Sequence, residues 1–143
     1  MVWVYVTGAF LAFLTAGTIW VRVRTRRIAA SRAGEDFSNF VASFAPMEAP
    51  SREMRAVYAK FQQWCSDAVL AFPVRADDDI ARIYGMVGED LDDAILEVLA
   101  ECERVLPEQE QLNRMGPVVT VRDFLRFVAA CPIRSNVSQR MRV

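Results

Sequence analysis

The sequence predicts an all-α protein in which a single N-terminal transmembrane helix precedes a small helical bundle. Three observations support this fold class. Residues 2–21 carry no charged side chain. Four later stretches place apolar residues three and four positions apart, as on one face of a helix, and prolines separate these stretches. We expect a transmembrane helix over residues 1–21, a basic and amphipathic juxtamembrane linker over 22–50, a small helical bundle over 51–132 and a flexible basic tail over 133–143.

The uncharged N-terminal stretch has the length of a membrane span. A helix rises about 1.5 Å per residue, so residues 2–21 would cross the ~30 Å hydrocarbon core of a bilayer. Trp3, Tyr5 and Trp20 lie near its two ends, where aromatic rings prefer the headgroup region. A cleavable signal peptide would carry basic residues before the apolar run and small residues after it, whereas arginines follow this one.

The arginines that follow predict the orientation of the span. Four of them are expected at the membrane surface: Arg22, Arg24, Arg26 and Arg27. By the positive-inside rule, we expect a single-pass protein of the inner membrane with a cytoplasmic C-terminal domain. Contact with anionic headgroups and a role in topology alone are both consistent with these arginines. Gly8, Ala12 and Ala16 are spaced by four and offer a small-residue face for a homodimer.

The charge of the chain is unevenly distributed, although the formal net charge is only −1. Residues 67–110 hold thirteen acidic and three basic side chains, which predicts a protein partner with a basic surface and no nucleic acid. The chain has no histidine, which is the most frequent general base, and no Gly-rich phosphate loop. Its three cysteines are far apart, so we expect reduced, buried thiols. We predict a non-enzymatic protein without a catalytic residue, cofactor or metal.

The segment of residues 36–45 has one apolar face. Phe37, Phe40 and Phe44 are placed at helical spacing, and such a face either lies on a membrane surface or packs on the domain that follows. Packing is the commoner arrangement, and we favour it. Pro46 and Pro50 then mark the boundary of the bundle.

The first and last helices of the bundle have clear end signals. The first is predicted to begin after Ser51 as N-cap and to continue to Phe72. The last begins at a capping box formed by Thr120 and Asp123. Between them, the three aspartates at residues 77–79 lack the alternation of a calcium loop and are interpreted as a solvated turn. The predicted core includes Phe61, Leu99 and Phe124.

The second helix of the bundle, predicted from Asp90 until Pro107, is strongly acidic. The side chains predicted to bind a basic partner are Asp92, Asp93, Glu97 and Glu101. The last three are four positions apart and form one stripe of like charge, and such pairs cost a few tenths of a kcal/mol each. Such a stripe of repelling charges indicates a helix face that binds a basic partner. The alternative is an acidic face that is only solvated.

The sequence resembles the acyl carrier proteins, most clearly over residues 83–128, about half of the chain. Residues 84–94 read Tyr-Gly-Met-Val-Gly-Glu-Asp-Leu-Asp-Asp-Ala, which is also similar to bacterial acyl-carrier-like proteins of unknown function. Residues 105–107, Val-Leu-Pro, match the end of the family's acidic recognition helix. Residues 119–124 match the start of its last helix. The resemblance implies an acyl-carrier-like bundle.

One departure from the family pattern bears on its chemistry. Acyl carrier proteins attach phosphopantetheine to a serine within Asp-Ser-Leu at the start of the acidic helix. Here residues 89–91 read Glu-Asp-Leu, and no serine lies between Ser66 and Ser135. The resemblance therefore implies the family's fold without its prosthetic arm.

The predicted function is that of a non-catalytic, membrane-anchored docking or adaptor protein whose acidic helix binds a basic protein. Two alternatives stay open. One is an immunity or regulatory protein for a toxin or membrane enzyme, which a small acidic domain fits equally well. The other is an accessory carrier in lipid or polyketide synthesis, against which the missing serine argues.

Overall fold

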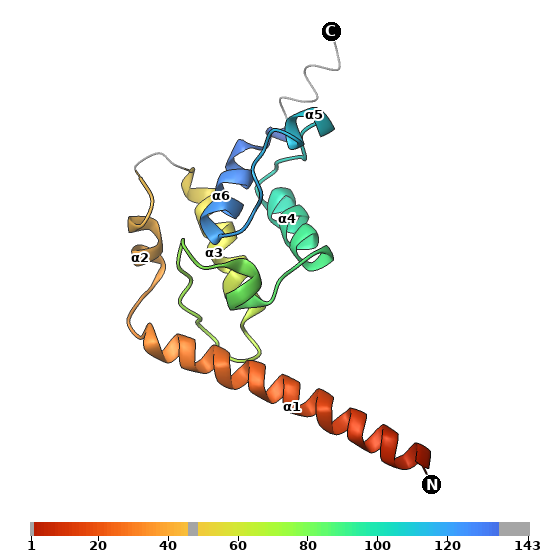
Figure 1. Ribbon diagram of the computed structural model, residues 1–143. Helices are drawn as coiled ribbons and strands as arrows, with labels where there is room; N and C mark the ends of the chain where they lie inside the picture. The colour runs from red at the N-terminus through yellow and green to blue at the C-terminus, as the bar shows by residue number, and fades with distance from the viewer. Residues whose placement is uncertain (1, 46–48, 135–143) are drawn as a thin grey trace.

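The described part of the chain is helical and forms one core (Figure 1). The computed structural model describes residues 2–45 and 49–134, with the backbone alone for residues 2–14. Within these residues there are two isolated β-bridges and no strand. The helical elements are α1 (Val2–Ser31), α2 (Phe37–Ala42), α3 (Ser51–Trp64), η1 (Ile80–Tyr84, one turn of π-helix), α4 (Glu89–Glu101), α5 (Gln109–Leu112) and α6 (Val121–Ala130).

Helix α3 lies at the centre of the core and packs against α4 and α6. Phe61 of α3 and Phe124 of α6 are completely buried, and their rings meet edge to face with centroids 5.3 Å apart. Leu99 of α4 is buried beside them in the same apolar cluster. The predicted core residues of these three helices are thus confirmed. The capping box at Thr120 and Asp123 is also present at the start of α6.

Helix α2 packs on α3 rather than standing apart from the bundle. Asp36 caps its first turn, and its carboxylate accepts hydrogen bonds from the Ser38 and Asn39 amides. Phe40 and Phe44 are buried, and the Phe40 ring lies 5.2 Å from that of Tyr58 on α3. The favoured interpretation of this amphipathic segment, packing on the domain, is confirmed.

Helix α1 requires the main correction. It does not end where the apolar run ends, but continues as one helix through the arginines to Ser31. In the described chain, no helix combines the length and the apolar character that a bilayer span needs. The predicted transmembrane helix over residues 1–21 is therefore wrong, and so is the single-pass inner-membrane placement that followed from it. The arginine-bearing turns after Val21 face the domain instead, since Thr25 and Arg32 are buried against it.

Two helices end earlier than their apolar spacing predicts. Helix α3 ends at Trp64 instead of Phe72, because Ser66 and Asp67 favour the turns that follow. Helix α4 ends at Glu101 in a Schellman motif, with Glu103 in the left-handed region (φ 56°) and the Arg104 amide donating to the Leu99 carbonyl at 2.8 Å. Leucine and proline after that point belong to a loop rather than to α4.

The loop of residues 73–80 is held by backbone hydrogen bonds to the start of α6. The Val121 amide donates to the Asp78 carbonyl at 3.0 Å, and the Ile80 amide donates to the Val119 carbonyl at 2.9 Å. The Arg122 amide donates to the Ala76 carbonyl at 2.7 Å. These bonds give a long connection a fixed path, and they place the side chain of Asp78 between α1 and η1.

Candidate functional site

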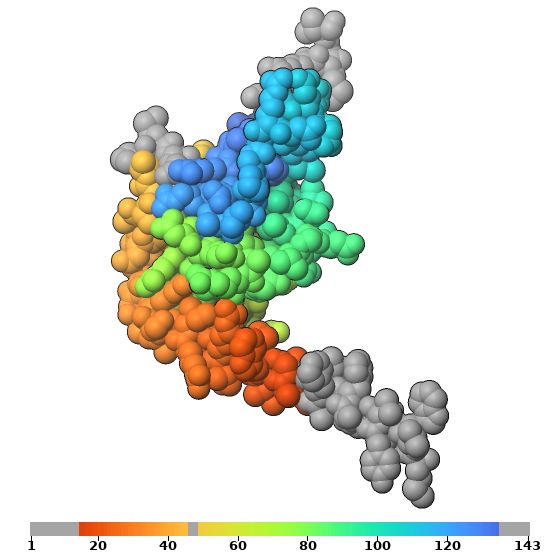
Figure 2. Space-filling view, in the orientation of Figure 1, coloured from red at the N-terminus to blue at the C-terminus, as the bar shows by residue number. Residues whose placement is uncertain are grey.

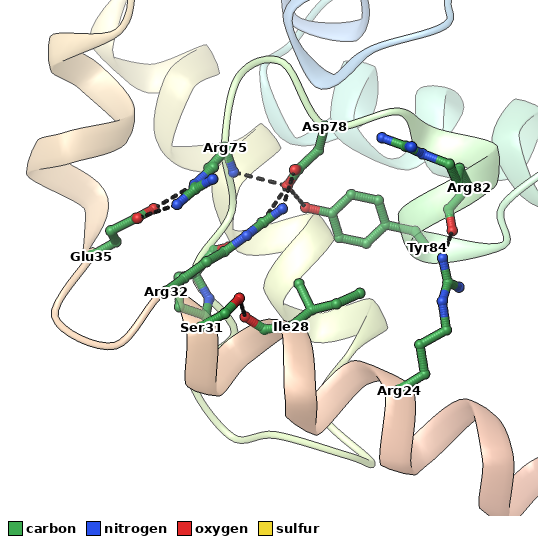
Figure 3. A network of polar contacts seen from close by, with 10 residues as sticks. Arg24, Ile28, Ser31, Arg32, Glu35, Arg75, Asp78, Arg82 and Tyr84 are labelled. Atoms are coloured by element: carbon green, nitrogen blue, oxygen red, sulfur yellow. Dashed lines mark hydrogen bonds and ion pairs between the residues drawn. The ribbon is translucent and has the colours of Figure 1, made fainter.

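Asp78 is the centre of a buried polar network that joins α1 to the rest of the molecule (Figure 3). Arg32 at the end of α1 donates from Nη1 to Asp78 Oδ2 at 2.8 Å and from Nη2 to Oδ1 at 2.5 Å. The Tyr84 hydroxyl donates to Oδ2 at 2.7 Å, and the Arg75 amide donates to the same oxygen at 3.0 Å. The carboxylate has four donors and is 5% exposed, so the prediction of a solvated turn is wrong for Asp78.

Tyr84 and Glu35, two side chains of this network, have shifted pKa values. Burial, followed by the nearby Asp78 carboxylate, raises the pKa of Tyr84 far above its usual value, so the phenol stays a hydrogen-bond donor. Arg32 also donates to the Pro73 carbonyl at 2.9 Å. At the edge of the network, Glu35 accepts from Arg75, and this hydrogen bond is the largest influence that lowers the pKa of Glu35. The network attaches the end of α1 to the domain, and its polar groups form hydrogen bonds with one another.

A second buried ion pair closes the opposite end of the core. Arg104, in the loop after α4, donates from Nε to Glu53 Oε1 at 2.7 Å. Its Nη1 also donates to the carbonyls of Ala129 and Cys131, at the end of α6. Glu53 Oε2 is buried without a hydrogen-bond partner among the described atoms. The pair holds α3, the end of α4 and the end of α6 together, which is a structural role.

A groove of about 500 Å³ lies beside α4, away from both networks. Its walls are almost entirely apolar, and the single charged side chain is a carboxylate. The groove is lined by Leu91, Asp92, Ile95, Leu96, Leu106, Leu112, Val118 and Phe127. Leu96 and Leu106 are 48% and 45% exposed, so leucine side chains at this surface meet solvent. The groove thus combines apolar walls with one acidic side chain on its edge.

The four acidic residues predicted to bind a partner occupy two different flanks of α4. Asp92 lies on the groove. Asp93, Glu97 and Glu101 form the predicted stripe, and all three are exposed. Glu97 accepts from Lys60 of α3, and Arg52 donates to the Glu101 carbonyl at 2.7 Å. The stripe therefore follows the α3 side of α4, and part of its charge already has a partner within the chain.

The four arginines predicted at a membrane surface also divide into groups. Arg24 donates from Nη2 to the Arg82 carbonyl at 2.5 Å, and Arg26 donates from Nε to the Ala68 carbonyl at 3.1 Å. Arg22 and Arg24 line a hollow of about 560 Å³ between α1 and the residues at and after the end of α3 and in η1. Arg27 is exposed. Of the small residues predicted to form a dimer face, Ala16 is exposed, and Gly8 and Ala12 lie where the structure describes the backbone alone.

The titratable groups in the described chain do not form a reactive arrangement. Cys65, Cys102 and Cys131 are free and buried. Burial raises the pKa of the Cys65 and Cys131 thiols to about 11, so both are neutral at ordinary pH. Over residues 2–45 and 49–134, no three acidic, cysteine or histidine side chains are grouped in a way that would hold a metal ion.

Comparison of the chain with protein-family models, with curated proteins and with solved structures finds no match. The resemblance to acyl carrier proteins therefore stays a prediction. The function has to be argued from the surfaces of this chain alone.

The groove contains residues that the sequence patterns assigned to other roles. Leu96 interrupts the polar side of α4, and it forms an apolar patch only together with groove residues from other elements. Leu106 falls within the helix predicted until Pro107, but α4 ends at Glu101, and Leu106 lies in the groove wall. Phe127 and Val118 approach the groove from α6 and from the loop before it, which no local pattern predicts.

Proposed function

We propose that this protein is a non-catalytic docking module that binds a helical segment of another protein in the α4–α5–α6 groove. The occupant is an amphipathic helix with an apolar anchor and basic flanking side chains. The single observation that carries the proposal is the apolar groove with Asp92 on its edge and half-exposed leucines in its walls. Helix-in-groove recognition uses anchors of this kind.

Charge supports a basic occupant. Asp92 lines the groove, and Glu89 and Asp90 at the start of the same helix are also exposed. Residues 86–96 contain no basic side chain. A cationic helix approaching this rim gains a faster encounter, and its apolar side chains supply the buried contact. An acidic or neutral helix would lack the first of these contributions.

The test is a binding measurement with defined synthetic peptides. One peptide of about five helical turns carries leucines on one face and lysines on its flanks, and a second has the same composition in scrambled order. Fluorescence anisotropy of the labelled peptides should show tighter binding of the first. Leu96→Gln should weaken that binding about ten-fold through the loss of apolar contact. Asp92→Asn should weaken it several-fold and reduce its salt sensitivity.

A matched variant on the other flank of α4 distinguishes docking in the groove from docking on the acidic stripe. Glu101→Gln also removes one exposed carboxylate of α4, but at a position outside the groove. It should leave binding unchanged. If Glu101→Gln weakens binding and Leu96→Gln does not, the acidic stripe of Asp93, Glu97 and Glu101 is the docking surface instead. Equal affinity for the ordered and scrambled peptides would reject both versions.

A further inference from the structure

Helix α1 carries an exposed apolar stripe that ends in an arginine. Ile19, Trp20 and Val23 are 61%, 64% and 41% exposed, and Arg27 is exposed one turn further on. Ile19, Val23 and Arg27 are spaced by four, so they project from the same side of the helix. We refer to Ile19, Trp20, Val23 and Arg27 as the α1 stripe. Large apolar side chains gathered on one exposed face mark an interaction surface.

The contacts of α1 hold this stripe away from its own domain. Thr25 and Arg32 are buried against the domain on the side of the helix opposite Ile19 and Val23. The exposed Trp20 ring meets the guanidinium of Arg24, which lies 5.7 Å from the ring centroid. Figure 1 shows α1 along one end of the molecule and α5 near the opposite end, and Figure 2 shows the same separation in space-filling form. The groove beside α5 is therefore out of reach of the α1 stripe of the same copy.

The α1 stripe and the α4–α5–α6 groove are complementary in chemistry. The stripe offers two aliphatic side chains and one aromatic side chain, followed by a guanidinium. The groove offers an apolar channel with Asp92 on its edge and further carboxylates at the start of α4. We infer that the groove of one copy binds the α1 stripe of a second copy, with apolar side chains in the channel and Arg27 facing the acidic rim. This inference rests on the proposed docking function of the groove and names its occupant.

Such a contact joins two different surfaces, so it is heterologous. After pairing, one copy keeps an unused stripe and the other keeps an unused groove, so further copies add head to tail into rings or open chains. The expected assembly of the full chain therefore grows with protein concentration beyond a dimer. It weakens as salt screens Arg27 and the carboxylates. A symmetric dimer would stop at two copies.

The experiment uses two variants that each disable one surface. Trp20→Gln/Val23→Gln removes apolar side chains of the stripe, and Leu96→Lys places a like charge opposite Arg27 in the groove. By sedimentation velocity, wild-type full chain should show masses above a dimer, and each variant alone should be a monomer. An equimolar mixture of the two variants should form a one-to-one complex and nothing larger, since only one functional stripe and one functional groove remain. Formation of that complex also demonstrates that both variants are folded.

A control and a peptide measurement separate the possible failures. Leu70→Gln removes another highly exposed leucine, outside both surfaces, and should assemble as wild type does. A wild-type protein that stays monomeric, or a mixture that forms no complex, overturns the inference. If Trp20→Gln/Val23→Gln still binds the basic synthetic peptide in that case, the docking function of the groove stands and only the occupant is wrong. If that variant binds no peptide either, both proposals fail.

Discussion

The guanidinium of Arg32 donates hydrogen bonds to both carboxylate oxygens of Asp78, a residue 46 positions further along the chain. Arg32→Met removes the only cationic side chain that contacts this carboxylate among the described residues and leaves a buried negative charge. We expect a loss of about 3–5 kcal/mol in the free energy of unfolding. Urea denaturation monitored by circular dichroism gives the value.

The double variant Arg32→Met/Asp78→Asn is the control for that measurement. It removes both charges, so it should be more stable than Arg32→Met alone despite having one more substitution. Equal destabilisation by the single and double variants would show that the charge on Asp78 is not what Arg32 compensates.

The centre of the core should respond strongly to truncation. Phe124 is completely buried against Phe61, so Phe124→Ala creates a cavity and should cost about 3–5 kcal/mol, measured by thermal or urea unfolding. Val119, half exposed just before α6, is the matched position. Val119→Ala should change stability by no more than about 0.5 kcal/mol. Similar effects at both positions would contradict the described packing of α6.

Glu103 has a backbone conformation that suits glycine. Its φ of 56° lies in the left-handed region, where a side chain costs about 1–2 kcal/mol. Glycine avoids this cost, but it loses more conformational entropy on folding than alanine does. The difference between these two contributions should make Glu103→Gly more stable than Glu103→Ala by about 0.5–1 kcal/mol. The comparison with alanine cancels the loss of the exposed contact with Arg52. Chemical denaturation of the two variants side by side tests this, and greater stability of the alanine variant would count against it.

Stability should fall in alkaline solution because of the buried thiols. Burial raises the pKa of Cys65 and Cys131 from the ordinary 9.0 to about 11. Between these values the unfolded chain has released protons that the folded chain still binds, so the free energy of unfolding decreases as pH rises from about 9 to about 11. Urea titrations in reducing buffer across that range should show the slope. The free energy of unfolding should depend less steeply on pH in Cys65→Ala/Cys131→Ala. An unchanged dependence would mean that other groups, such as Tyr84, cause the loss of stability.

The start of α4 should not accept a phosphopantetheine arm. Residues 89–91 read Glu-Asp-Leu, and no hydroxyl side chain lies in α4. Incubation with coenzyme A and a phosphopantetheinyl transferase should therefore leave the intact mass unchanged, with a known acyl carrier protein as the positive control. A mass gain equal to the arm would restore the carrier alternative.

Local signals predicted a large part of the bundle. The spacing of Leu99 and Phe124 identified buried faces of α4 and α6, and Thr120 with Asp123 identified the start of α6, because each pattern is complete within one or two helical turns. The ends of α3 and α4 were predicted too late, since apolar spacing continues beyond both. A glutamate at the left-handed position that ends α4 gives no signal of a helix end.

The two main errors share a physical cause. Three consecutive aspartates are normally interpreted as a solvated turn, and arginines after an apolar stretch are normally interpreted as a membrane boundary. Both interpretations change once the arginine and the aspartate that pair with one another are known. Arg32 and Asp78 neutralise one another across a long sequence separation, so neither segment alone shows that it is buried. The groove could not be predicted locally either, because its walls come from α4, α5, α6 and two loops that are far apart in the sequence.

The bonds between the Asp78 loop and α6 have a consequence for the order of folding. Arg32 needs Asp78 in place, and the Asp78 backbone is positioned by the amide of Val121. During synthesis, α1 leaves the ribosome first, yet its binding site is incomplete until residues near the other end of the chain have emerged. Contacts of such long sequence separation are costly to form early in folding. The N-terminal helix is thus synthesised first, but the acceptor of Arg32 is held in place by residues that are synthesised near the end of the described chain.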